Sequence, residues 1–99
     1  MEIKTEYKND ELIMSLIGRL DTITSDDLNN AIIEEKDNLN SLILNFQGVD
    51  YISSAGLRVL ISNMKSLKNE DKSLTIINVN DTILEIFKMS GFDKILKIE

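Results

Sequence analysis

The chain has 99 residues, 42% of them hydrophobic, which is the composition of a globular protein with one core. Its 17 acidic and 11 basic residues give a formal charge of −6, which argues against binding to nucleic acid or to an anionic membrane surface. There is no histidine and no cysteine, so Ser-His-Asp hydrolysis, histidine-ligated zinc, thiolate metal sites and disulfides are excluded.

Two strands are predicted at the beginning of the chain. Polar and less polar residues alternate from Glu2 to Tyr7, as in a strand with one solvated face at or near the edge of a sheet. Residues 8–10 have the composition of a turn, and Leu12–Ile17 is apolar at nearly every position. We therefore expect a second, more buried strand that pairs with the first as a hairpin.

A helix is predicted to follow this hairpin. Thr24 and Asp27 have the spacing of a capping box, and acidic residues suit the first turn of a helix. The helix is expected to close within residues 38–41, and its apolar stripe consists of Leu28, Ala31, Ile32 and Leu39. Leu42–Phe46 comes next, and its nearly continuous apolar run is typical of a central parallel strand.

The segment Asp50–Arg58 joins this strand to a second amphipathic helix. The apolar stripe of that helix has helical spacing and consists of Leu57, Leu60, Ile61, Met64 and Leu67. Ser53 and Ser54 therefore lie at the carboxyl end of a strand, and we predict Ser54 at the cap position of the helix. Backbone N–H groups lack acceptors there and the helix dipole favours negative charge, so a hydroxyl at this point is suited to carry a phosphate.

The rest of the chain predicts one more strand and one more helix. The strand is predicted over Leu74–Val79, and the helix is predicted over Ile83–Met89, capped by Asn80 or Asp81. Gly91 suits the left-handed position that ends a helix, and the apolar segment 95–98 is left unassigned. The order β-β-α-β-α-β-α predicts an α/β fold in which helices pack on a mixed, mostly parallel sheet opened by a hairpin.

Three motifs in this order resemble the STAS-domain family, and within it the small bacterial anti-sigma factor antagonists. Gly18–Asp21 is similar to the family's Gly-x-Leu-Asp. Tyr51–Arg58 resembles its aromatic-x-[Asp/Ser]-Ser-[Ser/Thr/Ala]-Gly-Leu signature, and Phe87–Phe92 resembles its helix ending in Ser-Gly. The resemblance covers essentially all of residues 1–99, which we expect to be a single STAS domain.

The resemblance implies a switch that works through protein partners. In that family the unphosphorylated antagonist binds an anti-sigma factor that is also a serine kinase, and this binding frees a sigma factor for transcription. The kinase then phosphorylates the antagonist, the complex dissociates, and a serine phosphatase resets the switch. By motif position the acceptor is Ser54, and Asp21 is the acidic residue near it that takes part in partner recognition. Ser53 stands where many antagonists have aspartate, and it is either a minor acceptor or simply a cap.

The resemblance thus implies a partner-binding surface, which we expect to be formed by Asp21, Ser53, Ser54, Ala55, Gly56 and Arg58. Purely structural interpretations stay open for several of these residues. Ser54 and Asp21 are residue types that also cap helices or form turns, and an outward Arg58 is either a solvated charge or a partner contact. Gly56 is interpreted as allowing close backbone packing, because the glycine-rich context of a phosphate loop is missing.

Two other classes of function are weighed against this switch. One is an unmodified scaffold or accessory subunit with the same fold, in a stress-signalling or lipid-transport complex. The other is a small enzyme or nucleotide-binding protein, which the missing histidine and phosphate loop disfavour, so we expect no catalytic residue, cofactor or metal. No apolar run approaches the roughly 20 residues that span a bilayer, and no secretory signal begins the chain, so a cytoplasmic protein without membrane insertion is expected.

Overall fold

The computed structural model describes all 99 residues, and its sheet has five strands in the order β1-β2-β3-β4-β5. These are β1 (Glu2–Lys8), β2 (Glu11–Leu20), β3 (Ser41–Ile52), β4 (Ser73–Ile77) and β5 (Lys97–Ile98). β1 forms one edge and is antiparallel to β2, whereas all the other neighbouring strands are parallel. The predicted mixed, mostly parallel sheet that opens with a hairpin is therefore confirmed.

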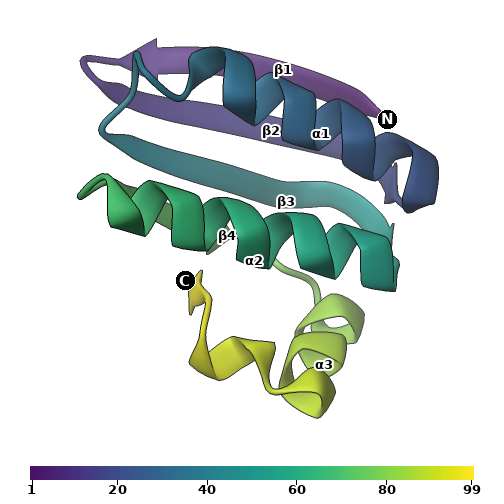
Figure 1. Ribbon diagram of the computed structural model, residues 1–99. Helices are drawn as coiled ribbons and strands as arrows, with labels where there is room; N and C mark the ends of the chain where they lie inside the picture. Colours follow the sequence, from purple (N-terminus) through teal and green to yellow (C-terminus); the bar gives the residue numbers. More distant parts are fainter.

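Helices cover one face of this sheet. They are α1 (Thr22–Glu35), α2 (Ser54–Asn69) and α3 (Asp81–Ser90), and a 3₁₀ helix, η1 (Phe92–Lys94), precedes β5. Because the strand order never reverses from β2 to β5, each right-handed crossover places its helix on the same side. Figure 1 shows α1 and α2 side by side in front of the strands. No helix combines the length and the apolar character that crossing a bilayer requires.

The core lies between the helices and one face of the sheet. Its completely buried strand residues include Leu12, Met14 and Leu16 of β2 and Leu42, Leu44 and Phe46 of β3. The residues between them face the uncovered side, where Ile17 keeps 41% of its surface exposed and Ile43 is half-buried. The apolar runs of these strands predict more complete burial than the structure shows. The strand order places all the helices on one face of the sheet, so the other face stays uncovered.

β3 continues well beyond the predicted strand end at Phe46 and stops only at Ile52. Its pairing with β2 shifts by one residue twice, once after Asn45 and once after Val49. At each shift β3 contains one extra residue, so the buried positions Phe46, Val49 and Ile52 are three residues apart instead of two. The period of two that marks a strand is lost there, and the sequence therefore predicts a loop where the sheet continues.

α1 begins earlier than the sequence predicts. Its N-cap is Asp21, whose Oδ1 accepts the backbone N–H groups of Ile23 at 3.1 Å and Thr24 at 3.0 Å. The Thr24 hydroxyl in turn accepts the backbone N–H of Asp21 at 2.8 Å, which completes a capping box. The predicted box of Thr24 and Asp27 was wrong by three residues, because β2 runs to Leu20 and the helix begins as soon as it ends.

The last elements agree with the prediction except at their ends. The Asn80 side chain caps α3 by accepting a backbone N–H of the first turn at 2.8 Å, and Gly91 ends the helix with φ of 77°. β4 ends at Ile77, before its predicted end at Val79. Earlier in the chain α1 ends at Glu35, before its predicted end within residues 38–41. The unassigned segment contains β5, which pairs with β4. Two residues are too short to show a period in the sequence.

Candidate partner-binding site

The two serines at the start of α2 have different roles. Ser53 has an extended backbone and is the N-cap, and its Oγ accepts the backbone N–H of Gly56 at 3.2 Å. Ser54 is the first residue of the helix, where it is exposed and its hydroxyl forms no hydrogen bond within the chain. The prediction of Ser54 as the cap was wrong by one position, because β3 and the connection to α2 end at Ser53. The hydroxyl of Ser54 is therefore free.

Asp21 lies at the same edge of the sheet as this pair. The backbone N–H of Ser53 donates to the carbonyl oxygen of Leu20 at 2.9 Å, which ties the start of α2 to the end of β2. The backbone hydrogen bond from Thr24 holds the pKa of the Asp21 carboxyl below its ordinary value of 3.8, and the charge of Arg19 acts in the same direction. Asp21 is thus a helix-capping carboxylate, and its part in partner recognition stays a prediction.

A second pair at this edge is not apparent from the sequence. The guanidinium carbon of Arg19 lies 4.2 Å from the ring centroid of Tyr51, and the two residues are paired across β2 and β3. Contacts of this kind at exposed sites are worth about 0.5–1 kcal/mol. Arg19 also places its Nε 3.9 Å from an Asp21 carboxylate oxygen. Pairing across the strands depends on the two register shifts of β3, which the sequence does not reveal.

Gly56 is buried in the first turn of α2. A Cβ atom at this position would lie 2.9 Å from the Leu20 Cγ and 3.0 Å from the Leu20 carbonyl oxygen. This confirms the interpretation that a glycine here allows the helix to approach the backbone of β2. Ala55 beside it is half-buried, whereas Arg58 is exposed and places its Nε 3.5 Å from the Ser54 carbonyl oxygen.

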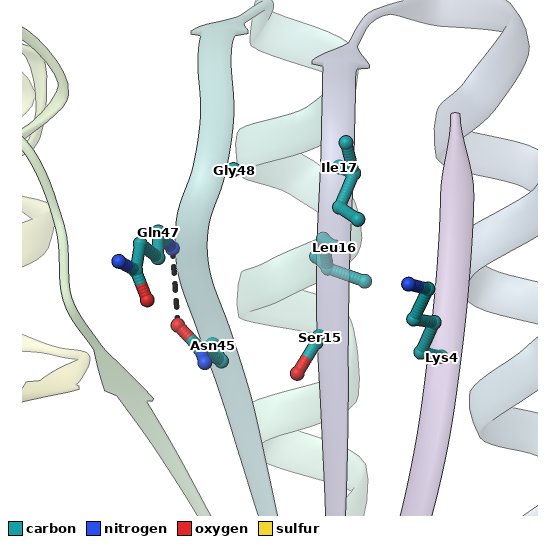
Figure 2. Close-up of a pocket in the computed structure, with 7 residues that line it drawn as sticks. All are labelled: Lys4, Ser15, Leu16, Ile17, Asn45, Gln47 and Gly48. Carbon is teal, nitrogen blue, oxygen red and sulfur yellow. Dashed lines mark hydrogen bonds between the residues drawn. The ribbon is translucent and has the colours of Figure 1, made fainter.

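The edge around Ser54 is an open surface and not a pocket. None of the hollows in the structure is lined by Asp21, Ser53 or Ser54. A hollow of about 400 Å³ lies on the uncovered sheet face. Figure 2 shows Lys4 of β1, Ile17 of β2 and Asn45 of β3 among the residues that line it. Small ligands are usually enclosed in concave sites, so the arrangement at Ser54 suits contact with a macromolecule better.

The chain is similar to known proteins over nearly all of its length. The model of the STAS domain family matches residues 2–99. The anti-sigma-B factor antagonist of Staphylococcus aureus (strain NCTC 8325 / PS 47) is 25% identical over 99 residues, which are 99% of this chain and 92% of that protein.

Solved structures of similar proteins have the same fold. A putative anti-sigma factor antagonist from Thermotoga maritima superposes with a TM-score of 0.90 at 18% identity, covering 97% of this chain and 84% of the other. Unphosphorylated SpoIIAA, an anti-sigma factor antagonist, superposes with a TM-score of 0.78 at 16% identity, covering 99% and 87% of the two chains. Since the family model extends over nearly every residue, the chain belongs to the STAS domain family.

Proposed function

We propose that this protein is an anti-sigma factor antagonist that is switched by phosphorylation. Unmodified, it binds an anti-sigma factor with serine-kinase activity and so releases a sigma factor; phosphorylation of Ser54 ends the binding. The observation that carries the proposal is the free, exposed hydroxyl of Ser54, beside a Ser53 that already caps the helix. The name of the Staphylococcus aureus relative supports the role, and SpoIIAA has been solved in unphosphorylated and phosphorylated forms.

The physical basis of the switch is the charge of the phosphate. A phosphoserine adds about −1.5 to −2 charges and three acceptor oxygens. At a helix N-terminus this charge gains roughly 0.3–1 kcal/mol, so the fold of the modified protein survives. A partner packed on the same edge has to desolvate the new dianion or oppose it with like charge, which costs several kcal/mol. An interaction weakened by that amount loses occupancy by orders of magnitude.

Mapping the phosphate on the protein isolated from its own cells tests the acceptor. We expect intact-mass and fragment analysis to find one phosphate on Ser54. The variant Ser54→Ala should remain unmodified when expressed in those cells, and the matched variant Ser53→Ala should still be phosphorylated. Phosphate on Ser53 alone would refute the assignment.

Binding to the kinase partner tests the charge mechanism. Ser54→Asp places a negative charge at the first residue of α2 and should weaken binding, whereas Ser54→Asn has nearly the same size without the charge. If Ser54→Asp bound the kinase as tightly as the unmodified protein, repulsion by the phosphate would not be the cause of release.

The proteins isolated together with this chain separate the switch from a scaffold role. An ATP-binding serine kinase among them, which binds a sigma factor when this chain is absent, supports the switch. A membrane transporter complex, with Ser54 never modified, supports the accessory-subunit function instead. The proposal places the protein in the cytoplasm, gives the removal of the phosphate to a serine phosphatase, and assigns no catalysis to this chain.

A further inference from the structure

The charges of the two long helices are segregated by sign. The charged residues of α2 are all cations, namely Arg58, Lys65 and Lys68, although the whole chain has a net charge of −6. None of these three cations forms an ion pair with another side chain of the protein. The charged residues of α1, in contrast, are all acidic, namely Asp26, Asp27, Glu34 and Glu35. A cationic surface within an acidic protein is therefore left without an internal partner.

Two hollows lie along this cationic side of α2. The first, of about 450 Å³, is formed between α2 and η1, with Ile61 and Phe92 as its apolar lining and Arg58 and Lys65 as its charged lining. The second, of about 220 Å³, is a separate hollow between Lys68 of α2 and the strands β4 and β5, and two further lysines line it. No carboxylate lines either hollow. We refer to the surface formed by Arg58, Ile61, Lys65, Lys68, Phe92 and Ile95 as the α2 groove.

The α2 groove begins next to the proposed phosphorylation site. Ser54, Arg58, Ile61, Lys65 and Lys68 follow one another at intervals of four, three, four and three residues along α2. Residues at these intervals lie on one side of a helix. Ile61 and Phe92 are half-buried and Ile95 is 48% exposed, so apolar surface is accessible between the cations. The groove thus combines apolar and cationic contacts along the helix that carries Ser54.

We propose that the α2 groove is the docking site for an acidic amphipathic helix of the protein partner. Its apolar residues would contact Ile61 and Phe92, and its carboxylates would pair with Arg58 and Lys65. A membrane is disfavoured as the occupant, because the chain as a whole has a net charge of −6 and anionic headgroups would repel it. The proposal rests on the proposed function in one respect: a phosphate on Ser54 lies one turn from Arg58 and repels the same acidic helix.

Unbiased peptide selection on the whole protein tests the chemistry of the occupant. Random 16-residue peptides displayed on phage are selected on the immobilised protein, and the enriched peptides are titrated into ¹⁵N-labelled protein. We expect an excess of Asp and Glu with apolar residues three and four apart, binding that weakens as salt rises, and chemical-shift changes at Ile61, Lys65 and Phe92. Recovery of no peptide, peptides without acidic excess, or shift changes centred on Ile17 and Ile43 would overturn the proposal.

Matched charge reversals test whether the effect is local. The double variant Arg58→Glu with Lys65→Glu should lower the affinity for a selected peptide by about tenfold or more, because two attractive contacts become repulsive. The control, Lys4→Glu with Lys8→Glu on β1, changes the net charge equally at exposed positions and should leave the affinity unchanged. Circular dichroism of both variants checks that they are folded. An equal loss of peptide affinity in both double variants would show that the effect comes from the overall charge, and it would contradict docking in the α2 groove.

Two further measurements distinguish this docking site from the phosphorylation switch and from self-association. Ser54→Asp should lower the affinity for the selected peptide more than Ser54→Asn does. If the peptide binds as expected but no phosphate is ever found on Ser54, the docking site is supported and the phosphorylation switch is contradicted. Sedimentation of the protein alone tests the remaining occupant, a second copy. Association in which the shift changes join Ile23 and Ile33 of α1 with the α2 groove would overturn docking of a partner in favour of self-association.

Discussion

Ser53 and Ser54 are adjacent residues whose hydroxyls have different contacts in the fold. The Ser53 hydroxyl accepts an N–H of the first turn, whereas the Ser54 hydroxyl has no partner in the fold. We expect Ser53→Ala to lower the free energy of unfolding by about 1 kcal/mol, the typical cost of losing an N-cap. Ser54→Ala should change it by less than about 0.5 kcal/mol, as for other exposed positions. Urea unfolding of the two variants measures both values, and equal losses would contradict the assigned roles.

Asp21 makes part of the stability dependent on pH. The backbone hydrogen bond from Thr24 lowers the pKa of the Asp21 carboxyl in the folded protein, so its stabilising effect is fully present above the ordinary value of 3.8. The effect is lost as the pH falls through the lower pKa of the folded state, because the protonated carboxyl is a weaker acceptor.

The variant Asp21→Asn isolates this contribution, since asparagine also caps helices but does not titrate in this range. Its unfolding midpoint should lie below that of the unmodified protein at pH 6, and the gap should narrow steadily as the pH is lowered from 4 to 2.5. Thermal unfolding across this range measures the gap. A gap that is constant over the whole range would show that the charge of Asp21 contributes nothing.

At the scale of elements, periodicity in the sequence was sufficient to identify the strands before β5 and the three helices in their order. The helical spacing of Leu57, Leu60 and Leu67 predicts α2 directly, and these residues are buried. What the sequence could not show is register. The extra residues of β3 depend on its pairing with β2, so neither the length of β3 nor the contact of Arg19 with Tyr51 follows from local pattern.

The candidate site was predictable to the same degree. Its position at the start of α2 follows from the spacing of the apolar residues and from the motif around Ser54. The assignment of the cap to Ser53 and not to Ser54 does not, because serine is favoured both as a cap and in the first turn. The α2 groove was missed for another reason: Phe92 and Ile95 approach α2 only through the path of the chain after α3.

α3 contributes to the core an aromatic contact that mutation can test. Phe87 is completely buried, and its ring centroid lies 6.4 Å from that of Phe46 on β3. We expect Phe87→Ala to lower the free energy of unfolding by about 3–5 kcal/mol, through lost burial and the cavity left behind. The matched variant Met89→Ala, in the same helix but 80% exposed, should cost less than about 0.5 kcal/mol. Chemical unfolding of both compares them; similar costs would mean that α3 does not depend on this contact.

The strand order explains why the edge around Ser54 is an open surface in the whole molecule. Ligand crevices in open α/β sheets form where the order of the strands reverses, and here the order from β2 to β5 has no reversal. The carboxyl ends of β2 and β3 instead bring the first residues of α1 and α2 together at one edge, and Figure 1 shows both helices in one layer. None of the hollows in the structure is lined by Asp21, Ser53 or Ser54, which makes this edge better suited to contact with a macromolecule than to enclosing a small ligand.

A charge added at this edge should leave the rest of the molecule unchanged. Ser54 is exposed and contributes no hydroxyl contact to the core, and a dianion at the start of α2 interacts favourably with the helix dipole. We therefore expect the phosphorylated protein to unfold at the same temperature as the unmodified protein or slightly above it. Changes in its ¹H–¹⁵N spectrum should be confined to the first turns of α1 and α2. The same sample after phosphatase treatment is the control. A lower unfolding temperature, or changes that extend to β4 and α3, would mean that phosphorylation acts by altering the fold and not by repelling a partner.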